Sequence, residues 1–298
     1  MRVCVADHGT VTIRSEKLTA RIAPLGAELV SLTDADGREL MSSGDPAYWT
    51  GRAPLLFPIV GRVRDDRYRV GGQEYALPQH GFARRMEFAL VEHGPANALF
   101  RLVDTPETRA NYPFAFQLDM AFALDGAELA MMATITNPGD VPLPASFGYH
   151  PAFARPLPYG AARADHRITF ERDEPAAICA ITDDALIAAE RLPSPVVGRD
   201  LPLHDALFEK DALVWDDLAS RRLRYGASTG KALDISFPDT PWLGIWTRPG
   251  APFVCVEPWA GMADPAGFAG EFHHKPGIFT LAPGTGRSFR MNVALVED

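Results

Sequence analysis

Apolar and polar residues alternate with a period of two in many short segments of the chain. In residues 128–136 (ELAMMATIT) every second side chain is apolar, from Leu129 to Ile135, and residues 288–296 (SFRMNVALV) repeat the pattern. This alternation predicts antiparallel strands with one buried face and one solvated face. Shorter runs of strand character occupy residues 11–15, 18–23, 28–34, 87–93, 98–104, 116–124, 167–172, 233–237, 243–247 and 253–257.

Turn dipeptides separate several of these runs. Gly71–Gly72 and Asp125–Gly126 each stand between two runs and tolerate the positive φ angles of tight hairpins. Helical patterns are few and short. They cover residues 105–113, 183–192 and, more weakly, 204–213.

Proline and glycine are spread over the whole chain and are not gathered into a linker. The 298 residues include 26 prolines and 25 glycines, which punctuate the short apolar runs. No internal repeat and no low-complexity segment interrupts the pattern. These features predict an all-β fold, with residues 1–298 forming one large antiparallel β-sandwich domain with a few short helices.

Composition and charge narrow the classes of partner. Apolar residues make up 47% of the chain and charged residues 22%, which is typical of a globular protein with a substantial core. The net charge is −9 and no basic block occurs, so we expect neither nucleic acid nor a membrane as partner. The polar N-terminus and the lack of a long apolar run predict a cytoplasmic protein. We expect a monomer or a homodimer.

The cysteines offer no framework for cross-linking. Cys4, Cys179 and Cys255 lack CxxC spacing and have no HxxxH companion. Neither disulfides nor a structural zinc site are therefore expected.

Four turn-rich stretches carry titratable residues among aromatic ones. They contain Arg62, His80, His150 and Glu257, each in a turn or at the end of a strand. Singly, each has a structural explanation: a surface arginine, a turn histidine, a core histidine bonded to a carbonyl, and a carboxylate in a buried salt bridge. Together they provide an acid, a base and fixed donors for proton transfer on a hydroxyl-rich ligand.

Aromatic residues near these stretches would present apolar faces to the C–H surface of a sugar ring. They are Phe82, Phe147, Trp242, Trp246 and Trp259. In ASFGYHPAF (residues 145–153), His150 stands among Phe147, Tyr149 and Phe153. We expect these rings to form a stiff, partly dry wall around the imidazole, with the proline after it fixing the backbone.

Seven segments in this order resemble the aldose 1-epimerase (galactose mutarotase-like) family, and most closely its LacX-type branch. They are LFPIVGRVRDDRY, LPQHGFAR, ASFGYHPAF, KDALVW, ISFPDTPWLGIWT, VCVEPWAGMAD and KPGIFTLAPGTG. The resemblance runs from about residue 10 to the C-terminus. It implies a large antiparallel β-supersandwich with a sugar cleft and no metal or organic cofactor.

The resemblance also implies roles for individual residues. His150 matches the general acid of the family and Glu257 its general base. His80 and Arg62 match residues that bind sugar hydroxyls or the ring oxygen. Asp211 matches a ligand-binding aspartate more loosely, because the residues around it differ, and the identity of the sugar therefore stays open.

These matches imply an aldose 1-epimerase, an isomerase that interconverts the α and β anomers of a free aldose by acid–base ring opening. The alternatives are a hexose-6-phosphate 1-epimerase, a carbohydrate-binding β-sandwich without catalysis, and a cupin-like metal enzyme. For the phosphate epimerase, the arginines near the proposed cleft that could bind the phosphate are Arg64, Arg67, Arg84 and Arg85. For the metal enzyme, the residues that could coordinate the ion are His80, His150, Glu257, His273 and His274.

Overall fold

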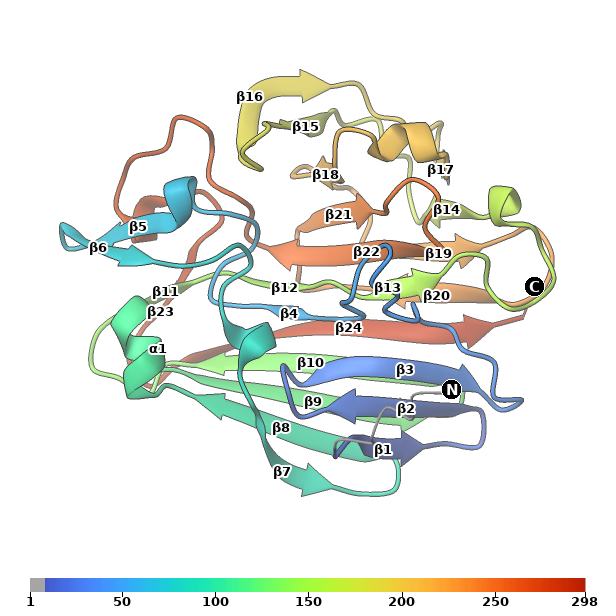
Figure 1. Ribbon diagram of the computed structural model, residues 1–298, viewed down its shortest axis with the longest axis horizontal. Helices are drawn as coiled ribbons and strands as arrows, with labels where there is room; N and C mark the ends of the chain where they lie inside the picture. The colour runs from blue at the N-terminus through green and yellow to red at the C-terminus, as the bar shows by residue number, and fades with distance from the viewer. Residues whose placement is uncertain (1–8, 298) are drawn as a thin grey trace.

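Two large sheets form the body of the protein in a computed structural model that describes residues 9–297 (Figure 1). The first sheet has nine strands in the order β17-β14-β19-β20-β24-β10-β9-β8-β7. Their bounds are β17 Asp200–Pro202, β14 Arg167–Phe170, β19 Arg222–Gly226, β20 Ala232–Ser236, β24 Gly286–Val296, β10 Glu128–Thr136, β9 Gln117–Asp125, β8 Asn97–Val103 and β7 Ala89–His93.

The second sheet has eight strands and carries the residues of most interest for function. Its order is β16-β15-β18-β21-β22-β12-β4, and β13 also pairs with β22. The bounds are β16 Ile187–Leu192, β15 Ile178–Ile181, β18 Leu213–Trp215, β21 Trp242–Trp246, β22 Phe253–Ala260, β12 Phe147–Tyr149, β4 Leu55–Leu56 and β13 Ala152–Ala154.

Smaller sheets complete the fold. They are β1-β2-β3 (Val11–Arg14, Leu18–Ala23 and Glu28–Asp34), β5-β6 (Arg67–Val70 and Gln73–Ala76) and β11-β23 (Leu143–Ala145 and Phe279–Leu281). The strands that pair within all these sheets are antiparallel. The predicted all-β antiparallel sandwich is confirmed.

The apolar faces of the strands meet in a continuous core. On β10 the alternate apolar residues from Leu129 to Ile135 are at most 2% exposed, as their period predicted. The Tyr149 hydroxyl on β12 donates to the Phe289 carbonyl at 2.8 Å and accepts from the Ala133 amide at 3.0 Å. This side chain therefore joins the second sheet to β24 and β10 of the first.

Both predicted hairpins form, one of them with a shifted turn. Gly71 and Gly72 have φ of 58° and 78°, as a type I′ turn requires. In the other hairpin Asp125 pairs with Glu128, so the turn begins at Gly126, one residue later than predicted. Gly126 has a φ of 53°, which fits the first central position of a type II′ turn.

One of the three predicted helices is confirmed. Helix α1 spans Pro106–Asn111, and the side chains and amides of Thr105 and Thr108 cap its start reciprocally. The remaining helices described are short 3₁₀ turns. They are η1 Arg64–Asp66, η2 Ala83–Arg85, η3 Arg163–Asp165, η4 Asp205–Phe208 and η5 Phe272–His274.

The other two helical predictions are wrong. Residues 183–192 form a turn at Ala185 (φ 60°) followed by strand β16, which pairs with β15. Residues 204–213 form only η4 before β18 begins. Alanine and glutamate favour helix in isolation, but in residues 183–192 strand pairing against β15 overrides that weak local preference.

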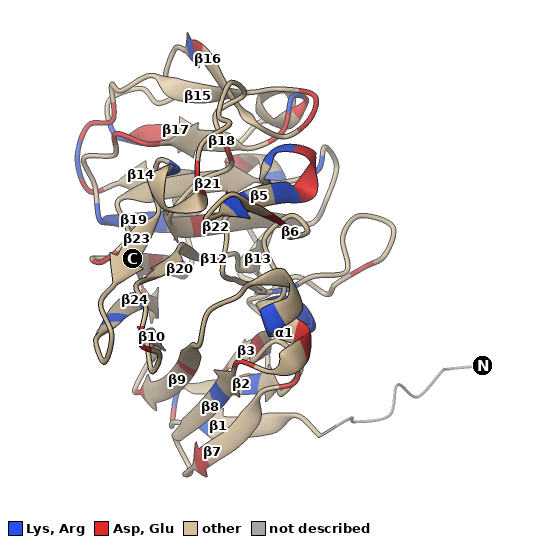
Figure 2. Ribbon diagram, turned by 90° about the vertical axis from the view of Figure 1, so that its left-hand side faces the viewer, with Lys and Arg blue, Asp and Glu red and all other residues tan. Residues whose placement is uncertain are grey.

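The surface carries mixed charge. Figure 2 shows basic and acidic residues interspersed over the side of the molecule that faces the viewer. Within residues 9–297 no helix has the length and apolar character needed to cross a bilayer. Cys179 and Cys255 are buried free thiols, and Cys4 lies outside the described residues.

Candidate active site

A break in one strand places an imidazole opposite a carboxyl group. Strands β12 and β13 lie end to end along β22 and pair with it in one register on both sides of the break. Continuing that register through the break places His150 opposite Glu257. Pro151 follows His150 and has no amide hydrogen to donate, although its carbonyl still accepts from the Val256 amide at 3.1 Å.

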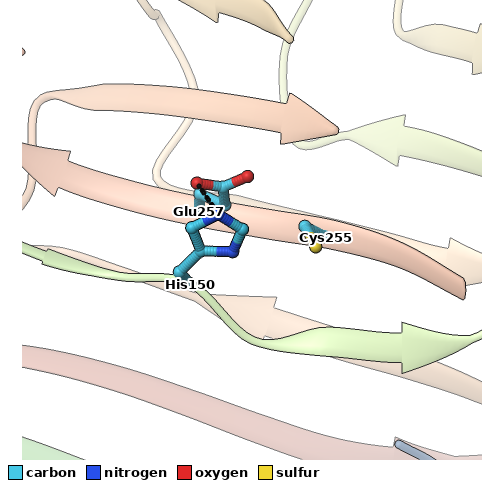
Figure 3. A group of neighbouring side chains, drawn as sticks. All are labelled: His150, Cys255 and Glu257. Atoms are coloured by element: carbon cyan, nitrogen blue, oxygen red, sulfur yellow. Dashed lines mark ion pairs between the residues drawn. The ribbon is translucent and has the colours of Figure 1, made fainter. Parts of the chain in front are cut away.

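The two side chains form a buried pair (Figure 3). His150 Nε2 lies 3.1 Å from Glu257 Oε2, and the residues are 7% and 2% exposed. Burial lowers the pKa of His150 to about 3, and the Arg84 guanidinium adds to this effect. Burial also raises the pKa of Glu257 well above its usual range, and the negative charge of Asp211 adds to this shift. Desolvation therefore outweighs mutual attraction and favours a pair that shares one proton.

The pair lies in the wall of a cavity of about 300 Å³, at the lower end of the range typical of small-ligand pockets. Most of the lining comes from the second sheet and the loops that leave it. The lining residues used below are Trp49, His80, Arg84, His150, Asp211, Trp246, Arg248, Glu257 and Trp259. Four of the five residues predicted for the site, His80, His150, Asp211 and Glu257, therefore meet around one cavity.

Trp259 lies flat over neighbouring strands because two glycines leave room for its ring. A Cβ on Gly244 of β21 would lie 2.6 Å from indole carbons of Trp259, and one on Gly148 of β12 equally close. The indole nitrogen is buried and has no hydrogen-bond partner among the described residues. It lies close enough to Glu257 to favour the ionised carboxylate.

His80 is held so that one ring nitrogen can donate to a ligand. The Gly61 amide donates to His80 Nδ1 at 3.1 Å, so Nδ1 is unprotonated and the neutral ring carries its hydrogen on Nε2. Burial lowers the pKa of His80 well below its usual value, and His150 and Arg84 act in the same direction. A φ of 65° aims the ring, a conformation uncommon outside glycine.

Asp211 stands at the exposed rim of the cavity. Its φ is 98°, and its carboxylate accepts from the Ala212 amide at 2.8 Å. Side chains hold such backbone conformations only where the surroundings enforce them, and these positions concentrate at functional sites. Asp211 is therefore an acceptor presented at the cavity mouth by a strained loop.

Arg62 does not line the cavity. Its guanidinium makes two hydrogen bonds of 2.8 Å to Asp66, and the side chain is 37% exposed. Arg84 lies in the cavity wall instead, with its Nε buried and unpartnered and one terminal nitrogen donating to the Gln79 carbonyl at 2.8 Å. Arg84, the last residue of the segment LPQHGFAR, thus supplies the cavity wall with the cation that the sequence analysis had expected from Arg62.

The aromatic wall differs from the prediction. Phe147 and Tyr149 point into the core between the sheets, because the period of two turns them away from His150. Trp49 stacks on the His150 ring with centroids 4.8 Å apart, and Trp246 approaches its edge at 6.0 Å. The sequence analysis missed Trp49. The one feature that could have indicated its role is that it is a lone tryptophan in the turn-rich segment DPAYWTG.

One group of potential metal ligands occurs in the described part of the chain. Ligand atoms of His150, Cys255 and Glu257 lie within 4.8 Å of one another (Figure 3). Burial raises the pKa of the Cys255 thiol well above its usual value, and Glu257 adds to this, so the thiolate that a metal requires is disfavoured. His273 and His274 lie in η5 and do not line the cavity. These donors fit a proton-transfer pair beside a neutral thiol better than a metal centre.

The model for the aldose 1-epimerase family matches residues 9–292 of the chain. This protein belongs to the aldose 1-epimerase family. The chromosomal protein LacX of Lactococcus lactis subsp. lactis is 32% identical over 284 residues, which cover 92% of this chain and 95% of LacX.

Solved structures of similar proteins share the fold over nearly the whole chain. A galactose mutarotase related enzyme from Lactobacillus acidophilus superposes with a TM-score of 0.90 at 29% identity, over 97% of this chain and 98% of that one. A galactose mutarotase-like protein from Lactobacillus casei ATCC 334 also gives 0.90, at 30% identity, covering 97% and 100%. The fold is therefore the galactose mutarotase-like β-supersandwich expected from the sequence motifs.

Proposed function

We propose that this chain interconverts the α and β anomers of a free aldose, with Glu257 as general base and His150 as general acid. The 3.1 Å contact between His150 Nε2 and Glu257 Oε2, in the wall of an indole-lined cavity, carries the proposal. Anomer exchange moves protons at two oxygens bonded to one carbon. An acid and a base must therefore act side by side, and this contact is short enough for both to reach one anomeric centre.

The chemistry balances with a single proton on the pair. Burial favours the form in which Glu257 holds that proton, so the proton moves to His150 across the 3.1 Å contact before the ring opens. Glu257 takes the proton of the anomeric hydroxyl while His150 gives its proton to the ring oxygen, and the bond from C1 to the ring oxygen breaks as the C1 carbonyl forms. The open-chain aldehyde then faces a protonated Glu257 and a neutral His150. Rotation about C1–C2 exposes the other carbonyl face, and closure reverses both transfers. Each positioned group contributes about 10²–10⁴-fold.

The remaining lining residues are proposed to hold the sugar. His80 Nε2–H and the Arg84 guanidinium supply donors, Asp211 supplies an acceptor, and Trp49, Trp246 and Trp259 supply flat apolar faces. Arg62 would join them only by leaving Asp66, so its binding role remains a prediction from the family resemblance.

A hexose-6-phosphate epimerase is the second candidate. Arg84 and Arg248 both line the cavity, and neither pairs with a carboxylate within the described residues. Two such cations would suit an anionic group on the sugar. Comparing anomer exchange of glucose with that of glucose 6-phosphate separates the two candidates.

Glu257→Gln tests the acid–base pair directly. The amide has the shape of the protonated carboxyl group but cannot accept the proton, so we expect kcat to fall by about 10²–10⁴-fold with the fold retained. Polarimetry on purified anomers measures the rate, and circular dichroism checks the fold. Wild-type rates in this variant would refute the role of Glu257. Saturable sugar binding without exchange in the unmodified protein would favour the non-catalytic alternative.

A further inference from the structure

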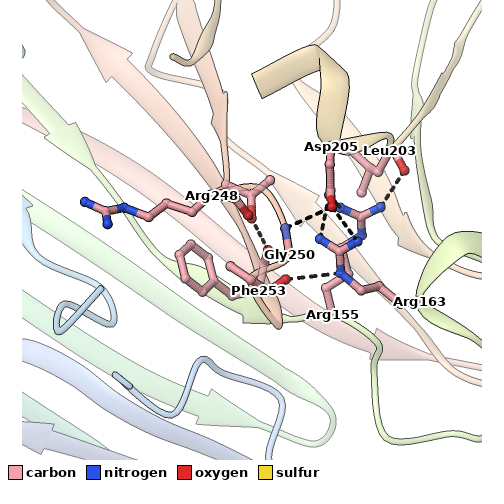
Figure 4. A network of polar contacts seen from close by, with 9 residues as sticks. Arg155, Arg163, Leu203, Asp205, Arg248, Gly250 and Phe253 are labelled. Atoms are coloured by element: carbon pink, nitrogen blue, oxygen red, sulfur yellow. Dashed lines mark hydrogen bonds and ion pairs between the residues drawn. The ribbon is translucent and has the colours of Figure 1, made fainter. Parts of the chain in front are cut away.

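Two arginines converge on one carboxylate outside the catalytic cavity (Figure 4). Arg163 contacts Asp205 at 2.7 Å, and Arg155 lies 3.7 Å from the same carboxylate. Arg155 is 1% exposed, and among the described residues Asp205 is the only carboxylate that pairs with it. The bonds from Arg163 lower the pKa of Asp205, so the carboxylate is ionised at neutral pH. Because a buried cation without a counter-charge is costly, these three residues, the Asp205 cluster, are held together.

The Asp205 cluster joins two loops at the rim of the cavity. Asp205 begins η4, which leads to Asp211, and its carboxylate accepts from the Gly250 amide at 2.9 Å. Gly250 belongs to the turn between β21 and β22, and this turn carries Arg248. Asp211 and Arg248 both line the cavity. The bond from Gly250 to Asp205 therefore fixes the two rim loops relative to each other.

Further hydrogen bonds from the two arginines brace the same loops. Arg163 donates to the Ala251 carbonyl at 3.1 Å, and the Arg155 amide donates to the Pro252 carbonyl at 2.9 Å. A terminal nitrogen of Arg155 donates to the Leu203 carbonyl, shortly before η4. The cluster thus holds the turn after β21 on one side and the start of η4 on the other.

The two rim residues depend on their loops for position. Asp211 has a φ of 98°, and such a conformation persists only where the surroundings enforce it. The Arg248 side chain points away from the cluster (Figure 4), and it makes no hydrogen bond or ion pair within residues 9–297. Neither side chain is therefore anchored from its own tip to the rest of the fold.

From these contacts we propose that Asp205 is a positioning residue, which holds Asp211 and Arg248 at the cavity mouth in the arrangement that binds the ligand. This inference rests on the proposed function, since it takes the cavity beside His150 and Glu257 as the site of sugar binding. No residue of the Asp205 cluster lines that cavity, so the cluster acts on the ligand only through the two loops. Its loss should therefore affect KM more than kcat.

Asp205→Asn tests this role. The amide keeps the shape of the side chain and one acceptor, but it cannot neutralise the two guanidinium groups. For glucose and galactose we expect KM by polarimetry and Kd by calorimetry to rise about tenfold, as loss of one positioned hydrogen bond implies, with kcat changed by less than about twofold. Asp234→Asn is the matched control, because Asp234 also binds two arginines, Arg222 and Arg224, but does not line the cavity. It should leave KM unchanged.

Two further measurements distinguish positioning from a general loss of stability. Asp211→Ala should raise KM in the unmodified protein and add little in the Asp205→Asn background, because Asp211 has already lost its position there. Amide hydrogen exchange of residues 206–212 and 247–251 should be faster in Asp205→Asn than in Asp234→Asn. If Asp205→Asn does not fold, Arg163→Gln loosens the cluster without leaving Arg155 unpaired and should change KM in the same direction.

The outcomes separate this inference from the proposed function. Unchanged KM and Kd in both cluster variants, or a higher Kd without faster amide exchange in either segment, would overturn the positioning role and leave the epimerase proposal intact. An equal rise of KM in Asp234→Asn would also overturn it. If the unmodified protein bound sugar without exchanging anomers, weaker binding by Asp205→Asn would support the positioning role, and the catalytic proposal alone would fail.

Discussion

At the scale of single residues, the protonation of one pair decides what the cavity can do. An exposed imidazole next to a carboxylate would become cationic, since opposite charges favour the ionised forms. In this protein burial acts the other way on both partners, lowering the pKa of His150 to about 3 and raising that of Glu257. The pair therefore resists both the gain of a second proton and the loss of its only one.

This resistance predicts an unusually broad pH profile. The acid limb of kcat/KM reports addition of a second proton to the pair, and burial moves it below the ordinary imidazole pKa of about 6.5. The alkaline limb reports loss of the last proton, and burial moves it upward. We expect a flat rate across neutral pH when spontaneous exchange is subtracted. An acid limb near 6.5 would mean that His150 is solvated in the working enzyme.

The family resemblance assigns sugar binding to Arg62, whereas the structure places Arg84 in the cavity wall, and variants of the two arginines distinguish these assignments. Arg84→Ala removes a partly buried donor from the cavity and should lower kcat/KM by roughly 10–150-fold, as loss of a charged hydrogen bond of about 1.5–3 kcal/mol implies. Arg62→Ala removes an exposed pair with Asp66, worth about 0–1 kcal/mol, and should change kcat/KM little. Equal losses would show that Arg62 leaves Asp66 and binds the sugar.

At the scale of strands and loops, the cavity depends on glycines that let Trp259 lie against the sheet. Gly244→Ala would place a methyl group 2.6 Å from the indole, so the ring must move toward the cavity that it lines. Overpacking of this kind costs about 1–3 kcal/mol, and we expect both a lower Tm and a higher KM. Gly267→Ala is the control, because no atom lies within 4 Å of its added Cβ. A lower Tm with unchanged KM would make Trp259 structural only.

The strands themselves could be predicted, because period-two alternation is a local property of the sequence. The face-to-face position of His150 and Glu257 could not, since it depends on the register between β12, β13 and β22, which lie far apart in the chain. Only the family motifs connected the two residues before the structure did. Arg84 was named only among four arginines for a phosphate, and Trp49 was missed. One belongs to a 3₁₀ turn and the other to a loop, where no periodic pattern indicates the direction of a side chain.

At the scale of the whole molecule, a buried ion pair joins segments from distant parts of the chain behind the cavity. Lys275 Nζ lies 3.4 Å from Asp264 Oδ1 and also donates to the Met262 carbonyl. Asp264 in turn accepts from the Arg64 amide at 2.9 Å, and its carbonyl accepts from the Ile187 amide at 2.9 Å. The segment after β22 is thereby tied to η1, to β16 and to the segment around η5.

Lys275 makes a further prediction about stability at alkaline pH. Burial lowers its pKa from 10.5 to about 8 in the folded protein, with Asp264 opposing the shift. Between these values the unfolded chain holds a proton that the folded chain lacks, so this group makes unfolding less favourable as pH rises, by up to about 1.4 kcal/mol per pH unit.

Lys275→Met removes this contribution. Urea titrations measure the free energy of unfolding of the unmodified protein and of Lys275→Met. The difference between the two values should grow from pH 8 to pH 10, because only the unmodified protein has the lysine with the lowered pKa. Titrations of tyrosine and cysteine affect both proteins and cancel in the difference. Lys17→Met, at an exposed lysine, controls for the loss of one positive charge. A difference that stays constant over this range would mean that Lys275 remains charged in the folded protein, and that the ion pair with Asp264 outweighs the desolvation of the ammonium group.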